Sequence, residues 1–318
     1  RKLRLSALKY DIIHSVNFVS DTIPSFAYKL NTKTVWGPIS HHEPIPRELN
    51  TVLGNLVSRT KFYLRSLIWT TFSIREKIKK FDLVLYSNES VPLRLGRTTN
   101  MKRWPSTGVE AKYGIEGEEI NSKVVVVTFA GRMVPIKGWM VLCDAIEKLS
   151  REKNVKRVHF DLIGDGPMFK QIKKRLEKRV CNHKISWLLH GSLKHRKFLK
   201  LMQSSHVYAC PSFEGGGIAV AEAMSIGLPV ICFDNFGPGE TVGPDYKGLV
   251  RKNLEGRFEF DRFYDRLLNI IEDESFRQIC RQQSLKRVKD HLLWADKVEK
   301  VMSFYADLSS ANKSDETG

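Results

Sequence analysis

The chain has 318 residues, 42% of them hydrophobic, and its 52 Lys and Arg against 35 Asp and Glu leave a formal net charge of +17. At roughly 100–200 residues per domain, this length favours two domains over one. The apolar runs are too short for a membrane-spanning helix, and the amino end lacks the apolar core of a secretory signal, so we expect a soluble, cytoplasmic protein.

The positive charge favours an anionic partner, and composition leaves open whether that is a phosphate-bearing ligand, an anionic lipid surface or nucleic acid. Three basic runs contribute to it: Arg75–Lys80, Lys170–Arg179 and Lys194–Lys200. The five cysteines are scattered without a C-x-x-C pair, so we expect buried thiols rather than zinc ligands or disulfides.

Short β-branched runs alternate along the chain with longer segments of helical periodicity. The expected strands are residues 34–39, 82–87, 123–131, 157–164, 184–191, 206–212 and 228–234. The expected helices begin at Gly138, Pro167, His195 and Ile218. Several strands are apolar on both faces, as buried parallel strands are, so the alternation predicts an α/β fold with doubly wound parallel sheets.

A polar, Gly-rich segment near residues 100–121 is the expected connection between two domains. We expect an amino-terminal domain over 1–121, a carboxy-terminal domain with its closing helices over 122–306, and a flexible tail over 307–318. Ligands of doubly wound sheets bind at the carboxyl ends of the strands.

One such end carries the stretch SFEGGGIAVAEAMSIGLPVI, which sets Glu214 and Glu222 on either side of three glycines. A short helix is expected from near Gly217 to Gly227. Its amino terminus forms an anion site, because unpaired amides and the positive end of the helix dipole point at the ligand. Two carboxylates flanking a phosphate pocket suit a diphosphate with a sugar at each end, as in a nucleotide sugar.

The segment GRMVPIKG follows the strongest strand of the second half and carries Arg132 and Lys137. Arginine can donate two hydrogen bonds to phosphate oxygens, whereas lysine acts as a point charge. Because both residues follow a strand in the same domain as the glutamates, we expect them to bind the diphosphate.

The succession FAGRMVPIKG, LIGDGP, HGSL, PSFEGGGIAVAEAMSIGLPVI and FGPGE resembles the carboxy-terminal donor domain of GT-B glycosyltransferases of family 4, over about Lys123–Val250. The resemblance implies two Rossmann-like domains and retaining transfer of a sugar from a nucleotide diphosphate donor, with no metal or other cofactor. It also implies that Glu214 faces the transferred sugar and Glu222 the nucleotide ribose. The donor-binding residues that it implies are Gly131, Arg132, Lys137, Gly216, Gly217, Ile218 and Glu222.

The stretch TVWGPISHHEPIP is similar to the amino-terminal half of these enzymes, where a histidine after a strand lies beside the sugar and the acceptor. His41 and His42 both stand near that position, and we favour His41 as the catalytic residue. His14 is expected to be structural. The first domain is expected to be truncated, because the strand and glycine-rich loop with which the family normally begins are not found.

The sequence leaves three alternatives open. A glycosidase could use Glu214 and Glu222 as acid and nucleophile, but would leave Arg132 and Lys137 unexplained. A sugar-nucleotide epimerase on the same scaffold would release free nucleotide and sugar without an acceptor. A non-enzymatic polyanion-binding protein would suit the charge, although no nucleic-acid-binding module is recognisable and no nucleic-acid partner is expected.

The expected partners are a nucleotide sugar and a glycan or lipid-linked acceptor, in bacterial surface polysaccharide or glycolipid synthesis. The basic helices, and the aromatic and basic residues of Leu49–Lys80, predict reversible docking on the cytoplasmic face of an anionic membrane.

Overall fold

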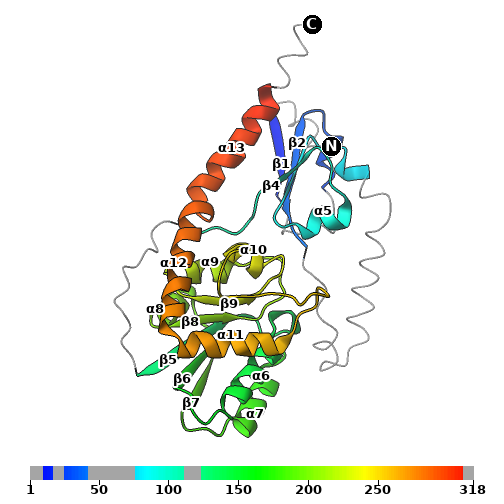
Figure 1. The fold of residues 1–318 in the computed structure, drawn as a ribbon. Helices are drawn as coiled ribbons and strands as arrows, with labels where there is room; N and C mark the ends of the chain where they lie inside the picture. Colours follow the sequence, from blue (N-terminus) through cyan, green and yellow to red (C-terminus); the bar gives the residue numbers. More distant parts are fainter. Residues whose placement is uncertain (1–9, 17–24, 42–75, 111–122, 311–318) are drawn as a thin grey trace. The chain divides into compact units, whose positions relative to one another are not determined.

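In the computed structural model, the described residues are 10–16, 25–41, 76–110 and 123–310. They divide into two compact units. The first comprises the described residues up to Gly108 together with residues 294–310, and the second runs from Val109 to Leu293. Each unit is built on a parallel β-sheet (Figure 1).

The first unit has a four-stranded sheet in the order β1-β2-β3-β4. Its elements are β1 (Ile12–Ser15), η1 (Ala27–Lys29), β2 (Lys33–Ile39), β3 (Leu83–Tyr86), α5 (Ser90–Leu95), β4 (Met101–Arg103) and α13 (Trp294–Ser310). Side chains on successive positions of a strand point to opposite faces. Trp36 and Val84 are therefore in one apolar cluster, while Val35 and Leu85 join Phe304 of α13 in another. Both faces are buried, as the apolar runs predicted.

The second unit has a six-stranded parallel sheet in the order β10-β9-β8-β5-β6-β7. Its strands are β5 (Val124–Ala130), β6 (Arg157–Ile163), β7 (Ile185–Gly191), β8 (Val207–Cys210), β9 (Val230–Phe233) and β10 (Leu249–Val250). Its helices are η3 (Pro135–Lys137), α6 (Trp139–Leu149), α7 (Phe169–Arg179), α8 (His195–Gln203), α9 (Ile218–Ser225), α10 (Pro238–Val242), α11 (Phe260–Glu272) and α12 (Glu274–His291).

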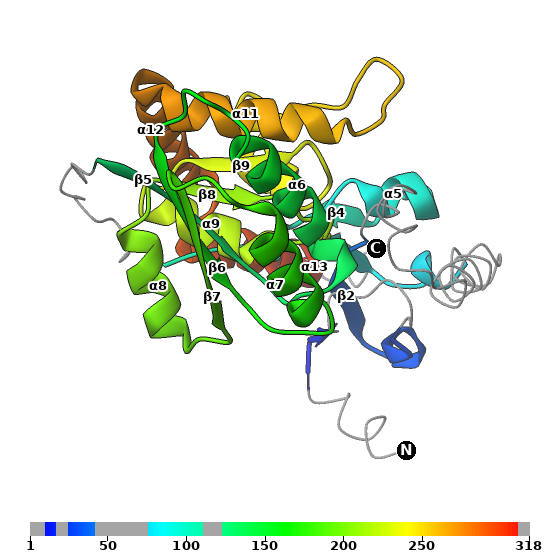
Figure 2. The ribbon, with the colours of Figure 1, turned by 90° about the horizontal axis from the view of Figure 1, so that it is seen from below.

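Helices cover both faces of this sheet (Figures 1 and 2). On one face α11 packs against α6 and α6 against α7; on the other α8 and α9 contact β5 and β8, and α12 packs on α9. The sequence order of the strands reverses between β5 and β8, and the loops after these two central strands therefore meet at the switch point. The predicted α/β fold with two Rossmann-like domains is confirmed.

The division of the chain differs from the predicted domains in three places. β4 lies inside the segment 100–121 that was expected to be a connection, because Met101 is buried and Val84 donates its amide hydrogen bond to the Asn100 carbonyl. α13 belongs to the first unit instead of closing the second. It also continues to Ser310, beyond the expected start of the tail at 307.

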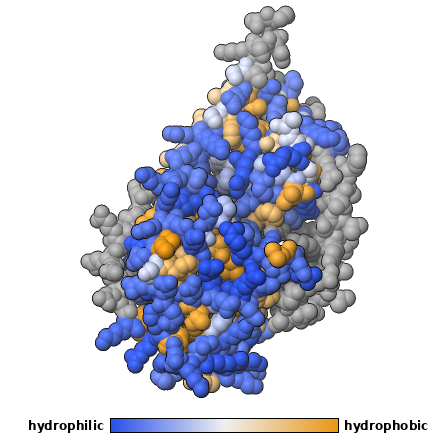
Figure 3. Space-filling view, viewed as in Figure 1, coloured by the Kyte–Doolittle hydropathy of each residue, from blue (hydrophilic) through white to orange (hydrophobic). Residues whose placement is uncertain are grey.

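The surface seen in Figure 3 is mostly hydrophilic, with apolar residues in separate small patches. In the described part of the chain, no helix combines the length and hydrophobicity that crossing a membrane requires. Four of the five cysteines are buried as predicted, whereas Cys181 is exposed.

Candidate functional site: the carboxyl edge of the second sheet

The loop after β5 carries the two predicted phosphate-binding cations. The Gly131 amide donates to the Ile163 carbonyl at 2.9 Å, and the Trp139 indole donates to the Arg132 carbonyl at 3.0 Å. Trp139 is fully buried, so it fixes the loop backbone to the core. The side chain of Arg132 is exposed, and within the described ranges it has no ion pair. Its guanidinium is therefore available to a ligand.

The loop after β5 packs directly on the segment after β8. Gly138 has a φ of +71°, and a Cβ there would lie 2.0 Å from the Pro211 carbonyl oxygen. The Phe213 amide donates to the Ile136 carbonyl at 2.8 Å. These backbone contacts explain why a glycine is needed at this position and why the two loops keep a fixed separation.

This packing pairs Lys137 with Glu214. The Lys137 Nζ lies 2.6 Å from the Glu214 Oε2, and their side chains are 20% and 36% exposed. The predicted diphosphate cation and the predicted sugar-facing carboxylate thus form one half-buried ion pair. A ligand that enters here meets both groups at once.

The glycines after Glu214 let the chain turn into α9. Gly216 is exposed, and Gly217 is the residue before the first helical turn. A Cβ on Gly217 would lie 2.4 Å from Thr241 Oγ1, whereas one on Gly216 would meet nothing within 4 Å. Ile218 begins the helix and is 62% exposed. The amino end of α9 consequently faces solvent at the same edge as Glu214.

The segment after β9 supports this loop in a way that the sequence did not predict. The Asn235 side chain donates a hydrogen bond to the Ser212 carbonyl at 2.7 Å. Its carbonyl oxygen accepts hydrogen bonds from the backbone amides of Gly237 and Gly239, each at 3.2 Å. A Cβ on Gly237 would lie 1.8 Å from the Glu214 carbonyl oxygen. The motif FGPGE is therefore a backbone support for the glutamate loop. The polar pair Asp234–Asn235 directly after an apolar strand is the signal that could have indicated it.

Glu222 lies one turn into α9 and has its own partner. Its Oε1 is 2.7 Å from the Nε2 of His195, the first residue of α8. The Glu222 side chain is 16% exposed and that of His195 is 60% exposed. Sequence reasoning gave His195 no role, although it follows the HGSL stretch by only a few residues.

Titratable groups beside the site argue against a thiolate nucleophile. Burial raises the pKa of Cys210, at the end of β8, to about 11, even though Lys137 acts in the opposite direction. The thiol is therefore protonated near neutral pH. Within the described segments, no three His, Cys, Asp or Glu side chains are grouped so that they could hold a metal ion.

The predicted residues of the first domain lie in the other unit. His41 follows β2, its ring accepts a hydrogen bond from Arg94, and its carbonyl accepts from Asn88 and Ser90 at 2.8 Å each. His14 Nε2 is 2.9 Å from the Gly37 carbonyl, and burial lowers the pKa of His14 although this hydrogen bond opposes it. His14 is thus a packed histidine. His42 lies outside the described residues, and the role of His41 stays a prediction.

The structure gathers eight predicted residues along one edge of the second unit. They are Gly131, Arg132, Lys137, Glu214, Gly216, Gly217, Ile218 and Glu222. Chemically, the arrangement offers a guanidinium that forms no ion pair with the described residues, an ammonium that can be exchanged between anions, the amino end of a helix, and two carboxylates that can accept hydroxyl hydrogen bonds.

The chain is similar in sequence to known proteins. The family described as "Glycosyl transferases group 1" matches residues 115–287. An uncharacterized glycosyltransferase of Methanocaldococcus jannaschii is 30% identical over 183 residues, which are 57% of this chain and 48% of that protein. The UDP-Gal:alpha-D-GlcNAc-diphosphoundecaprenol alpha-1,3-galactosyltransferase of Escherichia coli is 24% identical over 185 residues, 58% of this chain and 46% of the relative. The chain spans about half the length of these relatives.

Among solved structures, Anabaena HepE in complex with UDP and glucose is similar, with a TM-score of 0.65 and 17% identity over 96% of this chain and 80% of HepE. At this level of identity the likeness concerns the fold, and both sheets of the present chain take part in it because nearly the whole chain is covered.

Proposed function

Since the chain belongs to the family Glycosyl transferases group 1, we propose that it is a retaining, metal-independent glycosyltransferase of family 4 that uses a nucleotide diphosphate sugar. The observation that carries this proposal is the 2.6 Å pair between Lys137 and Glu214 at the amino end of α9. The pair brings together the cation that we propose binds the diphosphate and the carboxylate that we propose contacts the sugar.

The diphosphate is proposed to bind between the loop after β5 and the amino end of α9. Arg132 would donate two hydrogen bonds to phosphate oxygens, and Lys137 would leave Glu214 for the stronger charge of the diphosphate. Glu214 is then released to accept hydrogen bonds from the hydroxyls of the transferred sugar. Binding of the donor's diphosphate thus frees the Glu214 carboxylate to contact the donor's sugar.

Glu222 is proposed to accept hydrogen bonds from the ribose hydroxyls, while His195 holds one of its oxygens. The acceptor hydroxyl oxygen bonds to the anomeric carbon of the sugar as the bond from that carbon to the diphosphate oxygen breaks, and the hydroxyl proton passes to the departing diphosphate. The charge that develops on the nucleoside diphosphate is met by Arg132, Lys137 and the helix end. Such preorganised charges supply much of the rate enhancement in reactions with a charged leaving group. His41 is proposed to lie beside the sugar and the acceptor as a second catalytic residue.

The acceptor is proposed to be a glycan or a lipid-linked saccharide of a bacterial cell surface. The name of the E. coli relative specifies a diphosphoundecaprenol-linked acceptor, which supports the lipid-linked class. The exposed cations of α7 and α8, such as Lys174 and Lys197, support reversible docking of a cytoplasmic protein on an anionic membrane. Equal recovery in the supernatant after sedimentation with neutral and with anionic vesicles at low salt would contradict this docking.

Calorimetry with nucleoside diphosphates and their sugars tests the donor. A ligand at 100 times its Kd adds about 2.7 kcal/mol to stability, so a thermal-shift panel identifies the nucleotide first. Transfer assays with the selected donor should then give a product that keeps the anomeric configuration. Binding of no nucleotide in the panel, or a product of inverted configuration, would overturn the proposal. Release of nucleotide and sugar with no acceptor requirement would instead point to an epimerase.

A further inference from the structure

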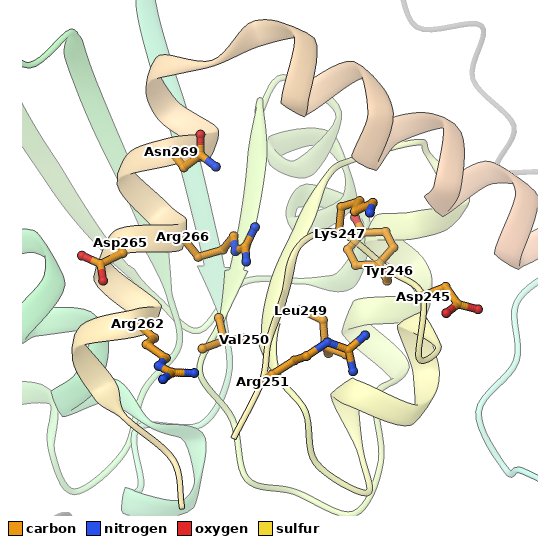
Figure 4. Close-up of a pocket in the computed structure, with 10 residues that line it drawn as sticks. All are labelled: Asp245, Tyr246, Lys247, Leu249, Val250, Arg251, Arg262, Asp265, Arg266 and Asn269. Atoms are coloured by element: carbon orange, nitrogen blue, oxygen red, sulfur yellow. The ribbon is translucent and has the colours of Figure 1, made fainter. Parts of the chain in front are cut away.

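A second basic site lies away from the donor residues, at the edge of the second sheet. A cavity of about 750 Å³ opens between α11 and the segment around β10 (Figure 4). Four cations line it: Lys247, Arg251, Arg262 and Arg266. None of the residues assigned to the donor lines this cavity, which we call the α11 groove.

The helical period places two of the arginines on one face of α11. Arg262, Arg266 and Asn269 are spaced i, i+4 and i+7, while Phe263 and Leu267 on the adjoining face are fully buried. In Figure 4, Arg262 and Arg266 extend from α11 toward β10, and the carboxylate of Asp265 points to the other side of the helix. Asp245, next to Tyr246 and Lys247, also lines the groove, which therefore carries four cations and two carboxylates.

The charges of the groove are only partly neutralised. Arg262 pairs with Glu259, and Arg251 lies 3.8 Å from the Asp234 carboxylate. Arg266 stands over the Phe276 ring, with its guanidinium 5.5 Å from the ring centre. Within the part of the chain that the structure describes, neither Arg266 nor Lys247 forms an ion pair with a carboxylate.

We propose that the α11 groove binds a polyanion that carries several phosphate groups in a row. Guanidinium groups match phosphate geometry, and cations supplied by two separate elements span more than one phosphate. The site goes beyond the proposed donor reaction, because none of the residues proposed to bind the donor lines the groove. Binding is expected to weaken steeply with salt, since each phosphate contact releases condensed counterions.

Fluorescence anisotropy with labelled inorganic polyphosphate tests the site on the full chain at low salt. The double variant Lys247→Gln/Arg266→Gln should bind the probe about tenfold more weakly. The matched control is Lys123→Gln/Lys153→Gln, which removes the same charge from exposed positions outside the groove and should change affinity less than about twofold. The single variant Arg266→Lys, which keeps the charge and leaves Lys247 unchanged, should retain most of the affinity for the probe.

Nucleoside diphosphate binding, measured by calorimetry, should be unchanged in the groove variant, so this test is independent of the proposed donor site. Three results would overturn the inference: no binding of polyphosphate by the wild-type chain at low salt, equal losses in the groove variant and the Lys123/Lys153 control, or complete displacement of the probe by a nucleoside diphosphate.

Discussion

Lys137 and Glu214 are 77 residues apart in the chain, yet the Lys137 ammonium donates a 2.6 Å hydrogen bond to the Glu214 carboxylate. The contact exists because the loops after two neighbouring parallel strands, β5 and β8, end at the same edge of the sheet. Without a donor, the two groups neutralise each other. Any ligand that binds one of them changes the charge state around the other.

Replacing Lys137 with Met should weaken binding of nucleoside diphosphates by roughly 1.5–3 kcal/mol, the usual scale of a hydrogen bond to a charged group. Methionine keeps the apolar stem that packs beside Gly131, so folding should be little changed. Calorimetry measures the affinity. Lys153→Met, on an exposed loop, is the control. Unchanged affinity in the Lys137 variant would show that the diphosphate does not bind here.

The two glutamates should respond differently to the two halves of the donor. Glu222→Ala should weaken binding of the nucleoside diphosphate itself, because the ribose hydroxyls lose their hydrogen-bond acceptor. Glu214→Ala should weaken chiefly the binding of the sugar-bearing donor. Each loss should be roughly 1–3 kcal/mol, since it leaves hydroxyl groups unpaired. Titrating both ligands into both variants checks this. Equal losses for both ligands in both variants would refute the assigned orientation.

Gly138→Ala should destabilise the second unit by at least about 2 kcal/mol, because a left-handed backbone is strained for alanine and a core contact must move. A methyl group there would lie 2.0 Å from the Pro211 carbonyl oxygen. Gly216→Ala is the matched control, since its methyl group would meet nothing within 4 Å. Urea unfolding measures both. Similar midpoints for the two variants would mean that the loop contact is not needed for folding.

Asp161 on β6 should make stability depend on pH. Burial by itself would raise the pKa of its carboxyl, but hydrogen bonds from His159 and His190 and their charges hold it below the usual value. A carboxyl whose pKa is lower in the folded state stabilises the fold at pH values above its pKa in the unfolded chain. This stabilisation is lost as the pH falls through the pKa of the folded state. Asp161→Asn should therefore be less stable than wild type at neutral pH.

The difference between wild type and Asp161→Asn should shrink below about pH 4, where the carboxyl of the unfolded chain becomes protonated. Urea unfolding at a series of pH values provides the measurement. Asp290→Asn, at an exposed position of α12, should show no such trend. A stability difference that stays constant from neutral to acidic pH would contradict the role of the histidine bonds.

Local patterns predicted the second unit well. Its strands, apart from the two-residue β10, lie within the apolar runs, and α9 begins after Gly217 as the glycine-rich stretch indicated. They predicted the first unit less well. β4 is only three residues long and pairs with β3. Its buried residue, Met101, does not lie in a run of apolar residues, so no local pattern predicted this strand.

By itself the sequence determined which residues stand at the carboxyl ends of parallel strands, because strand runs and the glycines after them are local signals. That was sufficient to select Arg132, Lys137 and Glu214. Only the tertiary structure decided that His195 contacts Glu222 and that Asn235 supports the glutamate loop.

The return of α13 to the first unit was likewise decided by packing, since Phe304 fits the apolar face formed by Val35 and Leu85. Such contacts join residues far apart in the chain. These contacts depend on which apolar surfaces remain exposed once the sheets have formed. The periodicity of a segment shows which of its faces is apolar, but not which other part of the chain will pack against that face.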